Sequence, residues 1–206
     1  EADARRRVLH AHLAEEVAAE VDQALARLAP GEGFFAVRSS ALEEDSARFS
    51  FAGQLESFLF VARGAVPARI VEVWASGFGE RLMRYRREAG LAALAGAPAV
   101  IVQRMIDGET SGVAFSADPV SGRRAVVVVG AVPGLGSALV SGDAVADTWR
   151  VDRTGAIIER TVEPKHSMHR ADATAPEGVS SVSVPPERAA APALTDAGVR
   201  EVADLA

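Results

Sequence analysis

Residues 35–57 gather an arginine, a pair of serines, an acidic cluster and a glycine turn in one short span. An apolar run at residues 34–37 is typical of a buried strand, and Arg38 and Ser39 stand at its end. A guanidinium offers a planar fork of N–H donors that suits phosphate, and serine hydroxyls with nearby backbone amides can complete a cradle for an anion. These residue types in this order indicate binding of a polyphosphate.

The same span also has a plainer interpretation. Arg-Ser-Ser after a strand is usually a solvated turn, and the acidic residues 43–45 could form the polar first turn of a helix. Further on, Gly53 stands among small and aromatic neighbours and is followed by Gln54, which suits a loop whose backbone must approach a ligand closely. Both interpretations stay open on these residues alone.

Two amphipathic helices are expected on either side of this span. Apolar residues recur at three- and four-residue spacing through residues 8–28, and Pro30 with Gly31 ends that helix. Pro67 begins a second helix that runs to about Ala89, with an apolar stripe and several arginines near its C-terminal end. We expect those arginines to form a solvated face that the helix dipole favours, with phosphate binding as the alternative.

The second half of the chain predicts mainly strands. Residues 99–102 and 112–117 are short apolar strands separated by an Asp-Gly turn, so a hairpin is the simplest interpretation. Gln103, directly after the first of them, is expected at the surface. Residues 125–129 form a continuous β-branched run, the best candidate for a strand buried on both faces, and residues 148–159 predict a second hairpin.

The last part of the chain predicts less regular structure. Residues 164–192 are rich in Pro, Ser, Thr and Ala, so we expect a long, partly mobile connection, with a possible edge strand at residues 180–184. Lys165, His166 and His169 could face a phosphate, but we expect them to face solvent. Thr195 is the N-cap candidate of a final helix.

Composition limits the class of protein. At 206 residues the chain is one large domain or two small ones, and a net charge of −6 argues against a generalised nucleic-acid binder. It has no cysteine, hence no disulfide framework and no thiolate metal site. The sequence has neither an apolar run that could span a bilayer nor a signal-peptide pattern, so we expect a cytoplasmic protein with no membrane partner. The chain begins without methionine inside a helical pattern and ends in another, which is typical of a piece of a longer protein.

Five ordered segments carry a resemblance to a known family. They are VRSSALEED, SFAGQLESFLFV, VWASGFGERLMRYR, VIVQRMIDGETSGVAFSADPVSG and PGLGSALVSG. In this order they resemble the ATP-binding domain of the pyruvate phosphate dikinase and phosphoenolpyruvate synthase family, which rifampin phosphotransferase and the glucan water dikinases share. The match runs from about residue 35 to residue 153, and five blocks in order are far more specific than a single glycine motif.

The resemblance implies an α+β fold of the ATP-grasp type. Two subdomains with mixed sheets flanked by helices would hold the nucleotide in the cleft between them. Residues 1–98 would be the first subdomain and residues 99–206 the second, with the hinge near residues 99–105.

The resemblance also assigns roles to individual residues. Arg38 would bind phosphate and act in catalysis, while Gly53 and Gln54 would belong to the loop over the phosphates. Gln103 would read the adenine edge, with the backbone near Met105 helping. The full set of expected nucleotide-binding residues is Arg38, Ser39, Gly53, Gln54, Ser57, Gln103 and Met105.

The implied activity is that of a dikinase. ATP with Mg²⁺ would phosphorylate a histidine on a separate domain, with release of AMP and phosphate, and that histidine would pass its phosphoryl group to pyruvate, a rifampin-type antibiotic or a glucan. The expected partners are therefore the phosphohistidine domain and the acceptor-binding domain of a parent protein. None of the four histidines in this chain stands in the family's phosphohistidine setting.

The chain also departs from the pattern of its relatives. The family usually carries a glutamate directly after Gly-Leu-Gly, where this chain has Ser137. Relatives further carry a glycine-rich segment with a phosphate-binding lysine, an acidic metal ligand and a Gln-Ser-Arg-Pro strand, which are absent here, so the metal ligands are unknown. Two hypotheses follow: an ATP-binding fragment of a phosphoenolpyruvate synthase-like dikinase, or a degenerate module with a regulatory or interaction role.

Overall fold

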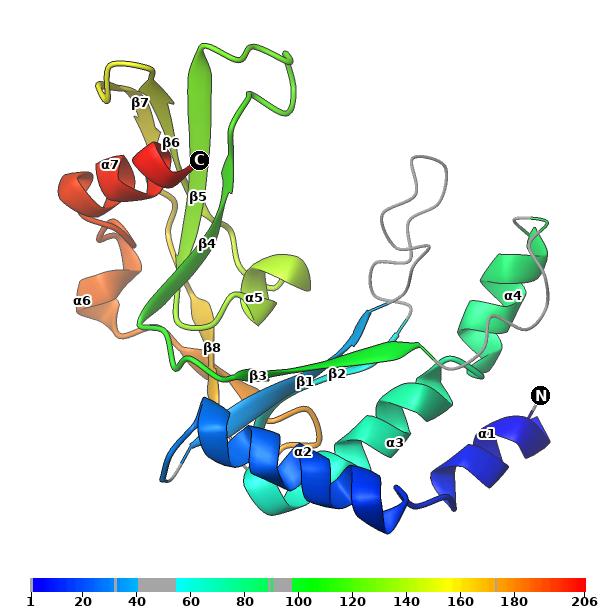
Figure 1. Cartoon of the computed structure of the whole chain (residues 1–206). Coiled ribbons are helices and arrows are strands. Elements are labelled where there is room, and N and C mark those ends of the chain that lie inside the picture. The colour runs from blue at the N-terminus through cyan, green and yellow to red at the C-terminus, as the bar shows by residue number, and fades with distance from the viewer. Residues whose placement is uncertain (1, 32, 41–54, 89, 91–97, 173) are drawn as a thin grey trace. The chain divides into compact units, whose positions relative to one another are not determined.

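A computed structural model of the chain describes residues 2–31, 33–40, 55–88, 90, 98–172 and 174–206 (Figure 1). The chain divides into two compact units. The first comprises Glu1–Ile106 and Asp172–Gly178, and the second comprises Asp107–Ala171 and Val179–Ala206. Gly53 and Gln54 of the expected phosphate loop lie outside the described residues, so their roles stay predictions.

The first unit contains a three-stranded antiparallel sheet in the order β2-β1-β3. Its strands are β1 (Phe34–Ser40), β2 (Ser57–Ala62) and β3 (Ala99–Arg104). Its helices are α1 (Ala2–Leu9), α2 (Glu15–Leu28), α3 (Val66–Ser76) and α4 (Glu80–Glu88), with a 3-10 turn at Arg63–Ala65. Phe35 and Val37 of β1 are buried in a core with Leu25 of α2 and Ile70 of α3, and both helices lie on the same side of the sheet (Figure 1).

The two long helices expected from apolar spacing are each interrupted, so both predictions were too long. Between α1 and α2, the Nδ1 atom of His10 lies 2.7 Å from the carbonyl oxygen of Arg6. This side chain therefore competes for a carbonyl at the end of α1. After α3, the amides of Gly77 and Gly79 bond to carbonyls three residues back, which tightens the last turn and ends the helix.

The second unit is built on a four-stranded antiparallel sheet in the order β4-β5-β6-β7. Its strands are β4 (Thr110–Phe115), β5 (Val126–Pro133), β6 (Asp147–Asp152) and β7 (Ile157–Thr161). Its helices are α5 (Ser137–Val140), α6 (Pro186–Ala189) and α7 (Asp196–Leu205). Every residue of β5 is buried, which confirms the strand predicted to be covered on both faces, and β6 pairs with β7 as the predicted hairpin. Thr195 is the N-cap of α7, because its side-chain oxygen accepts a hydrogen bond from the Gly198 amide.

The predicted hairpin between residues 99–102 and 112–117 is wrong, because the two strands enter different sheets. β3 pairs with β1 in the first sheet, and β4 pairs with β5 in the second. Val100 and Val102 of β3 pack against the core of the first unit. Burial of these apolar side chains therefore outweighs the short connection that favoured a local hairpin.

Residues 164–192 are more regular than their composition predicts. β8 (Ser167–Ala171) pairs with β9 (Val179–Ser183) in a two-stranded antiparallel sheet, where we expected a long irregular connection. Lys165, expected to face solvent, is buried, and its Nζ lies 2.7 Å from Oδ1 of the fully buried Asp147. The edge strand predicted at residues 180–184 is confirmed as β9, whereas the expectation for Lys165 is wrong because its partner Asp147 lies in a strand of the other sheet of the unit.

The fold class is α+β, as expected. Every strand pair among the described residues is antiparallel, so parallel pairing is not part of these sheets. In the part of the chain that the structure describes, no helix combines the length and apolar character needed to cross a membrane.

Candidate functional site

The first sheet brings Arg38, Ser57 and Ile101 together from three different strands. Arg38 of β1 is the register partner of Ser57 in β2 and of Ile101 in β3. Residues directly opposite each other in an antiparallel pair project to the same face, and the neighbouring Val37 belongs to the core. Arg38 and its two partners therefore lie on the sheet face opposite α2 and α3, which we call the Arg38 face.

The residues of the Arg38 face are open to a ligand within their own unit. The side chains of Arg38 and Ser57 are exposed, and Ile101 is 48% exposed. Among the described residues, none forms a hydrogen bond or an ion pair with the Arg38 guanidinium. A cation and a hydroxyl side by side, beside an apolar surface, can bind an anion that carries an apolar group.

The other expected site residues are placed differently. Gln103 is exposed and opposes Ala36, so it shares the Arg38 face. The Met105 amide donates to the Phe34 carbonyl at 2.8 Å, so this donor is already committed to β1. Ser39 opposes Val100, which packs against the core, so Ser39 projects to the other face from Arg38.

Sequence reasoning missed two apolar residues of the Arg38 face, Phe34 and Ile101. Phe34 is 45% exposed, and its ring meets that of Phe60 edge to face, with centroids 5.9 Å apart. Exposed apolar side chains of this kind offer a surface on which a planar base can stack. The alternation of buried and exposed residues along β1 could have placed Phe34 on this face, whereas Ile101 needed the pairing of β3 with β1.

The Gly-Leu-Gly-Ser turn belongs to the second unit and packs against β8. Gly134 has a φ of +76°, and a Cβ added there would lie 2.4 Å from the carbonyl oxygen of His169. The Leu135 amide donates to that same carbonyl at 3.0 Å. Close backbone packing therefore accounts for Gly134 without a phosphate.

Ser137 forms a hydrogen bond with His169 of β8. Its Oγ lies 2.9 Å from Nδ1 of His169, and Nε2 of this histidine lies 3.4 Å from Oδ2 of Asp143. His169 is itself mostly buried, with 12% of its side chain exposed. Ser137 is therefore part of a side-chain cluster with His169 of β8 and Asp143.

Asp118 is a buried carboxylate that accepts hydrogen bonds from three donors. It accepts from the Ser121 hydroxyl at 2.6 Å, the Val120 amide at 2.9 Å and the Arg150 guanidinium at 2.8 Å. These bonds, with Ser121 contributing most, hold the Asp118 pKa well below its usual range. The turn at residues 118–122 thus has a structural role in the second unit that its sequence did not indicate.

We expect this carboxylate to make the stability of the second unit depend on acid. A lowered pKa in the folded state contributes stability above the unfolded-state pKa of about 3.9, and this contribution is lost as pH falls below that value. The thermal midpoint of Asp118→Asn should therefore fall less than that of the wild type between about pH 5 and pH 2. Glu201→Gln, an exposed residue of α7, is the control and should follow the wild type. Parallel acid profiles for Asp118→Asn and the wild type would contradict the assignment.

The described residues contain no cluster of three or more metal-ligating side chains. Within the described ranges, no group of three or more His, Cys, Asp or Glu side chains could hold a metal ion. Mg²⁺ requires several oxygen ligands in near-octahedral geometry. In nucleotide sites Mg²⁺ commonly takes only one or two of these ligands from protein carboxylates and the rest from phosphates and water, so the finding concerns an all-protein metal site alone.

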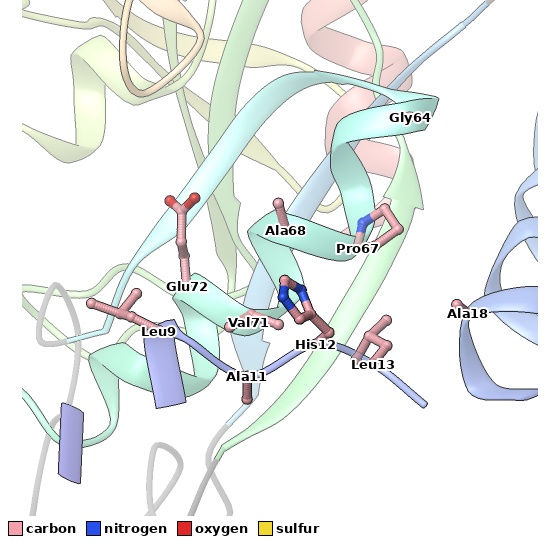
Figure 2. A pocket seen from close by; sticks show the side chains of 10 residues that line it. All are labelled: Leu9, Ala11, His12, Leu13, Ala18, Gly64, Pro67, Ala68, Val71 and Glu72. Atoms are coloured by element: carbon pink, nitrogen blue, oxygen red, sulfur yellow. The ribbon is translucent and has the colours of Figure 1, made fainter. Parts of the chain in front are cut away.

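A separate pocket of about 430 Å³ lies in the first unit, between α3 and the chain on either side of the α1–α2 connection (Figure 2). Its walls are mainly apolar, with His12 and Glu72 as the polar members. Glu72 is already paired with Arg69 at 2.6 Å. None of the expected nucleotide-binding residues lines this pocket.

Comparison with known proteins places the chain in a family. The sequence profile of the pyruvate phosphate dikinase, AMP/ATP-binding domain family matches residues 1–206, so the chain belongs to that family, as its five sequence blocks predicted. This membership implies an ATP-grasp-type domain.

The individual proteins to which the chain is similar include several differently named transferases and synthases. A rifampicin phosphotransferase of Streptomyces sviceus is 39% identical over 205 residues, which are 99% of this chain and 23% of the relative. The prodigiosin synthesizing transferase PigC of Serratia marcescens is 38% identical over 83% of this chain and 19% of its own length. A probable phosphoenolpyruvate synthase of Archaeoglobus fulgidus is 37% identical over 84% of this chain and 23% of its own length. The chain thus spans about a fifth of the length of these relatives.

Proposed function

We propose that this chain binds ATP on the Arg38 face and serves as the nucleotide-binding part of a dikinase-type phosphotransferase. The observation that supports this most directly is the register of the first sheet. It sets the Arg38 guanidinium, with which no described residue pairs, opposite Ser57 and beside the exposed Ile101 on a face that α2 and α3 leave free. Membership in an AMP/ATP-binding family makes ATP the natural ligand for that surface.

Each residue of the proposed site has a separate task. Arg38 neutralises phosphate charge with its fork of donors, and the Ser57 hydroxyl adds a further donor. Gln103 hydrogen-bonds the adenine edge, and Phe34 and Ile101 supply apolar surface for the base. Phosphoryl transfer depends mostly on positioning and charge stabilisation, so a few fixed donors suffice on the protein side. Magnesium bound to the phosphates would add further charge neutralisation.

We further propose that Gly53 and Gln54 belong to a loop over the phosphates. We also propose that the two compact units are the two subdomains of an ATP-grasp arrangement, with the boundary near residue 106 and not at the expected residue 98, because β3 pairs with β1 in the first sheet. Ser39 would then assist through its backbone, because its side chain projects to the core side of the sheet.

The complete reaction needs domains beyond this chain. In the proposed parent protein, a histidine on a separate domain takes one phosphoryl group from ATP, water takes another, and AMP and phosphate leave. The phosphohistidine then passes its group to an acceptor held by another domain, pyruvate in a phosphoenolpyruvate synthase-like parent or a rifampin-type antibiotic in the alternative. The small share of each relative that this chain covers supports such a division, and we place the parent in the cytoplasm, where ATP is available.

The test of ATP binding uses the 206-residue chain. ATP is titrated into isotope-labelled protein, with and without Mg²⁺, and amide chemical shifts are followed. We expect concentration-dependent shifts at Arg38, Ser57 and Ile101, because these residues surround the proposed phosphate and base positions. Shifts confined to the second sheet, or none at millimolar ATP, would contradict binding on the Arg38 face.

A second candidate is a degenerate module that keeps the scaffold and acts in regulation or interaction. The observation that favours it is Ser137, which replaces the family glutamate and is tied to His169 at 2.9 Å. A full-length parent that binds ATP and forms no AMP would support this candidate. AMP formation at a rate typical of an enzyme would exclude it.

A further inference from the structure

Strand β2 carries a bulge between Phe58 and Val61, close to Ser57. Phe35 of β1 opposes Val61, whereas Val37, two residues further along, opposes Phe58, so β2 has one residue more than β1 over this stretch. Phe60 lies within the bulge and has a φ of +50°. A bulky L residue rarely occupies this left-handed region, and such a backbone persists only where its surroundings hold it.

Residues 176–178, although distant in sequence, supply a large part of those surroundings. The Leu59 amide donates to the Glu177 carbonyl at 3.1 Å. Gly178 has a φ of +80°, and a Cβ added there would lie only 1.8 Å from the Leu59 carbonyl oxygen. The two backbones therefore meet so closely at the bulge that only glycine fits.

Arg69 of α3 ties the same segment to the sheet. Its Nη2 donates to the Pro176 carbonyl at 3.3 Å, and its guanidinium lies 4.4 Å from the centroid of the Phe58 ring. Its Nη1 also pairs with Glu72 at 2.6 Å, which fixes the side chain on the helix. One arginine thus joins α3, β2 and residues 176–178 around the bulge.

We propose that residues 176–178 are a positioning element for the nucleotide site: they hold the β2 bulge and thereby keep Ser57 opposite Arg38. A slip of one residue in a strand turns its side chains to the opposite face, so loss of the bulge would remove Ser57 from the Arg38 face. This inference rests on the proposed ATP site. It makes Gly178 and Arg69 determinants of ATP affinity although neither projects from the Arg38 face.

Two glycine variants of the same chain test this inference. Gly178→Ala introduces a Cβ into the contact with Leu59, and Gly155→Ala is the matched control. Gly155 has a φ of +82° with no atom within 4 Å of an added Cβ, so it shares the backbone conformation without the contact. Amide hydrogen exchange in β2 and the Kd for ATP are measured for both, well below their unfolding temperatures.

We expect Gly178→Ala to speed exchange in β2 and to raise the Kd for ATP by about tenfold or more, as displacement of a site residue by about 1 Å can do. Gly155→Ala should change neither. In a Ser57→Ala background, Gly178→Ala should bring no further loss of affinity, because it acts through the position of the Ser57 side chain. A merely structural role predicts the same loss in both backgrounds.

The outcomes separate this inference from the proposed function. Unchanged exchange in β2, or faster exchange with unchanged ATP affinity, overturns the positioning role. Absence of ATP binding in the wild type overturns the proposed function, while exchange still decides whether residues 176–178 hold the strand. Should Gly178→Ala not fold, Arg69→Ala replaces it, with Arg84→Ala as its control, since the partner of Arg84 among the described residues is the exposed Glu88 on α4. Equal β2 exchange in these two arginine variants also overturns the inference.

Discussion

Arg38→Ala in the full-length parent protein should abolish AMP formation from ATP. Arg38 supplies the guanidinium of the Arg38 face. Among the described residues, none pairs with this positive charge. Removal of one preorganised donor from developing phosphate charge commonly costs about a hundredfold to a thousandfold in rate. Because the Ser57 hydroxyl is the other phosphate donor proposed on this face, we expect kcat to fall by at least that factor and ATP to bind more weakly.

The measurement is AMP release under saturating ATP, supported by the ATP titration of this chain carrying the same substitution. Arg27→Ala is the control, because Arg27 is an exposed arginine in the last turn of α2, on the helix-covered side of the sheet. Arg38→Lys separates charge from geometry. If bidentate contact with phosphate matters, lysine restores binding only in part. Normal turnover by Arg38→Ala would contradict the assignment of Arg38 to the phosphate site.

Lys165→Met should destabilise the second unit by about 3–5 kcal/mol. The Lys165 Nζ and Asp147 are both buried, and their atoms lie 2.7 Å apart. Removing the cation leaves a carboxylate without a countercharge in the interior, next to the buried Trp149 and Val151 of the same strand. The free energy of unfolding, from urea titration, measures the loss.

Arg160→Met is the matched control, because Arg160 pairs with Asp196 at the surface of the same unit. We expect a loss of about 1 kcal/mol or less there. The double variant Lys165→Met with Asp147→Leu should recover part of the lost stability, since no charge then remains buried. Recovery cannot be complete, because the amides of Glu163 and Ala193 lose Asp147 as their acceptor. Equal losses for Lys165→Met and Arg160→Met would show that burial of the pair contributes nothing.

Local pattern was sufficient for several elements of this fold. The β-branched run in β5 was recognisable because a strand covered on both faces must be apolar at every position. The Thr195 cap and the β6–β7 hairpin were recognisable because both depend on residues within a few positions of each other. The interruptions of the two helices were not recognisable from the sequence, because the spacing of apolar residues continues across the breaks after α1 and α3.

The candidate site was predictable in part. Sequence blocks pointed to Arg38, Ser57 and Gln103, and the sheet places all three on one face. The alternation of side chains along β1 already indicates that Ser39 and Arg38 project to opposite faces, but only the packing of the core showed that Ser39 is on the covered face. Ile101 entered the site only through the pairing of β3 with β1, which local signals had assigned to a hairpin.

By itself, the sequence determined the family of this chain and the identity of its phosphate-binding candidate, because both depend on short ordered motifs around Arg38. Only the tertiary structure decided which residues stand beside that arginine, why Lys165 is buried, and how residues 176–178 reach the β2 bulge. The physical reason is common to all three. Strand register, burial of a charge and close backbone contact depend on partners far away in sequence, and their energies are settled only when the chain has folded.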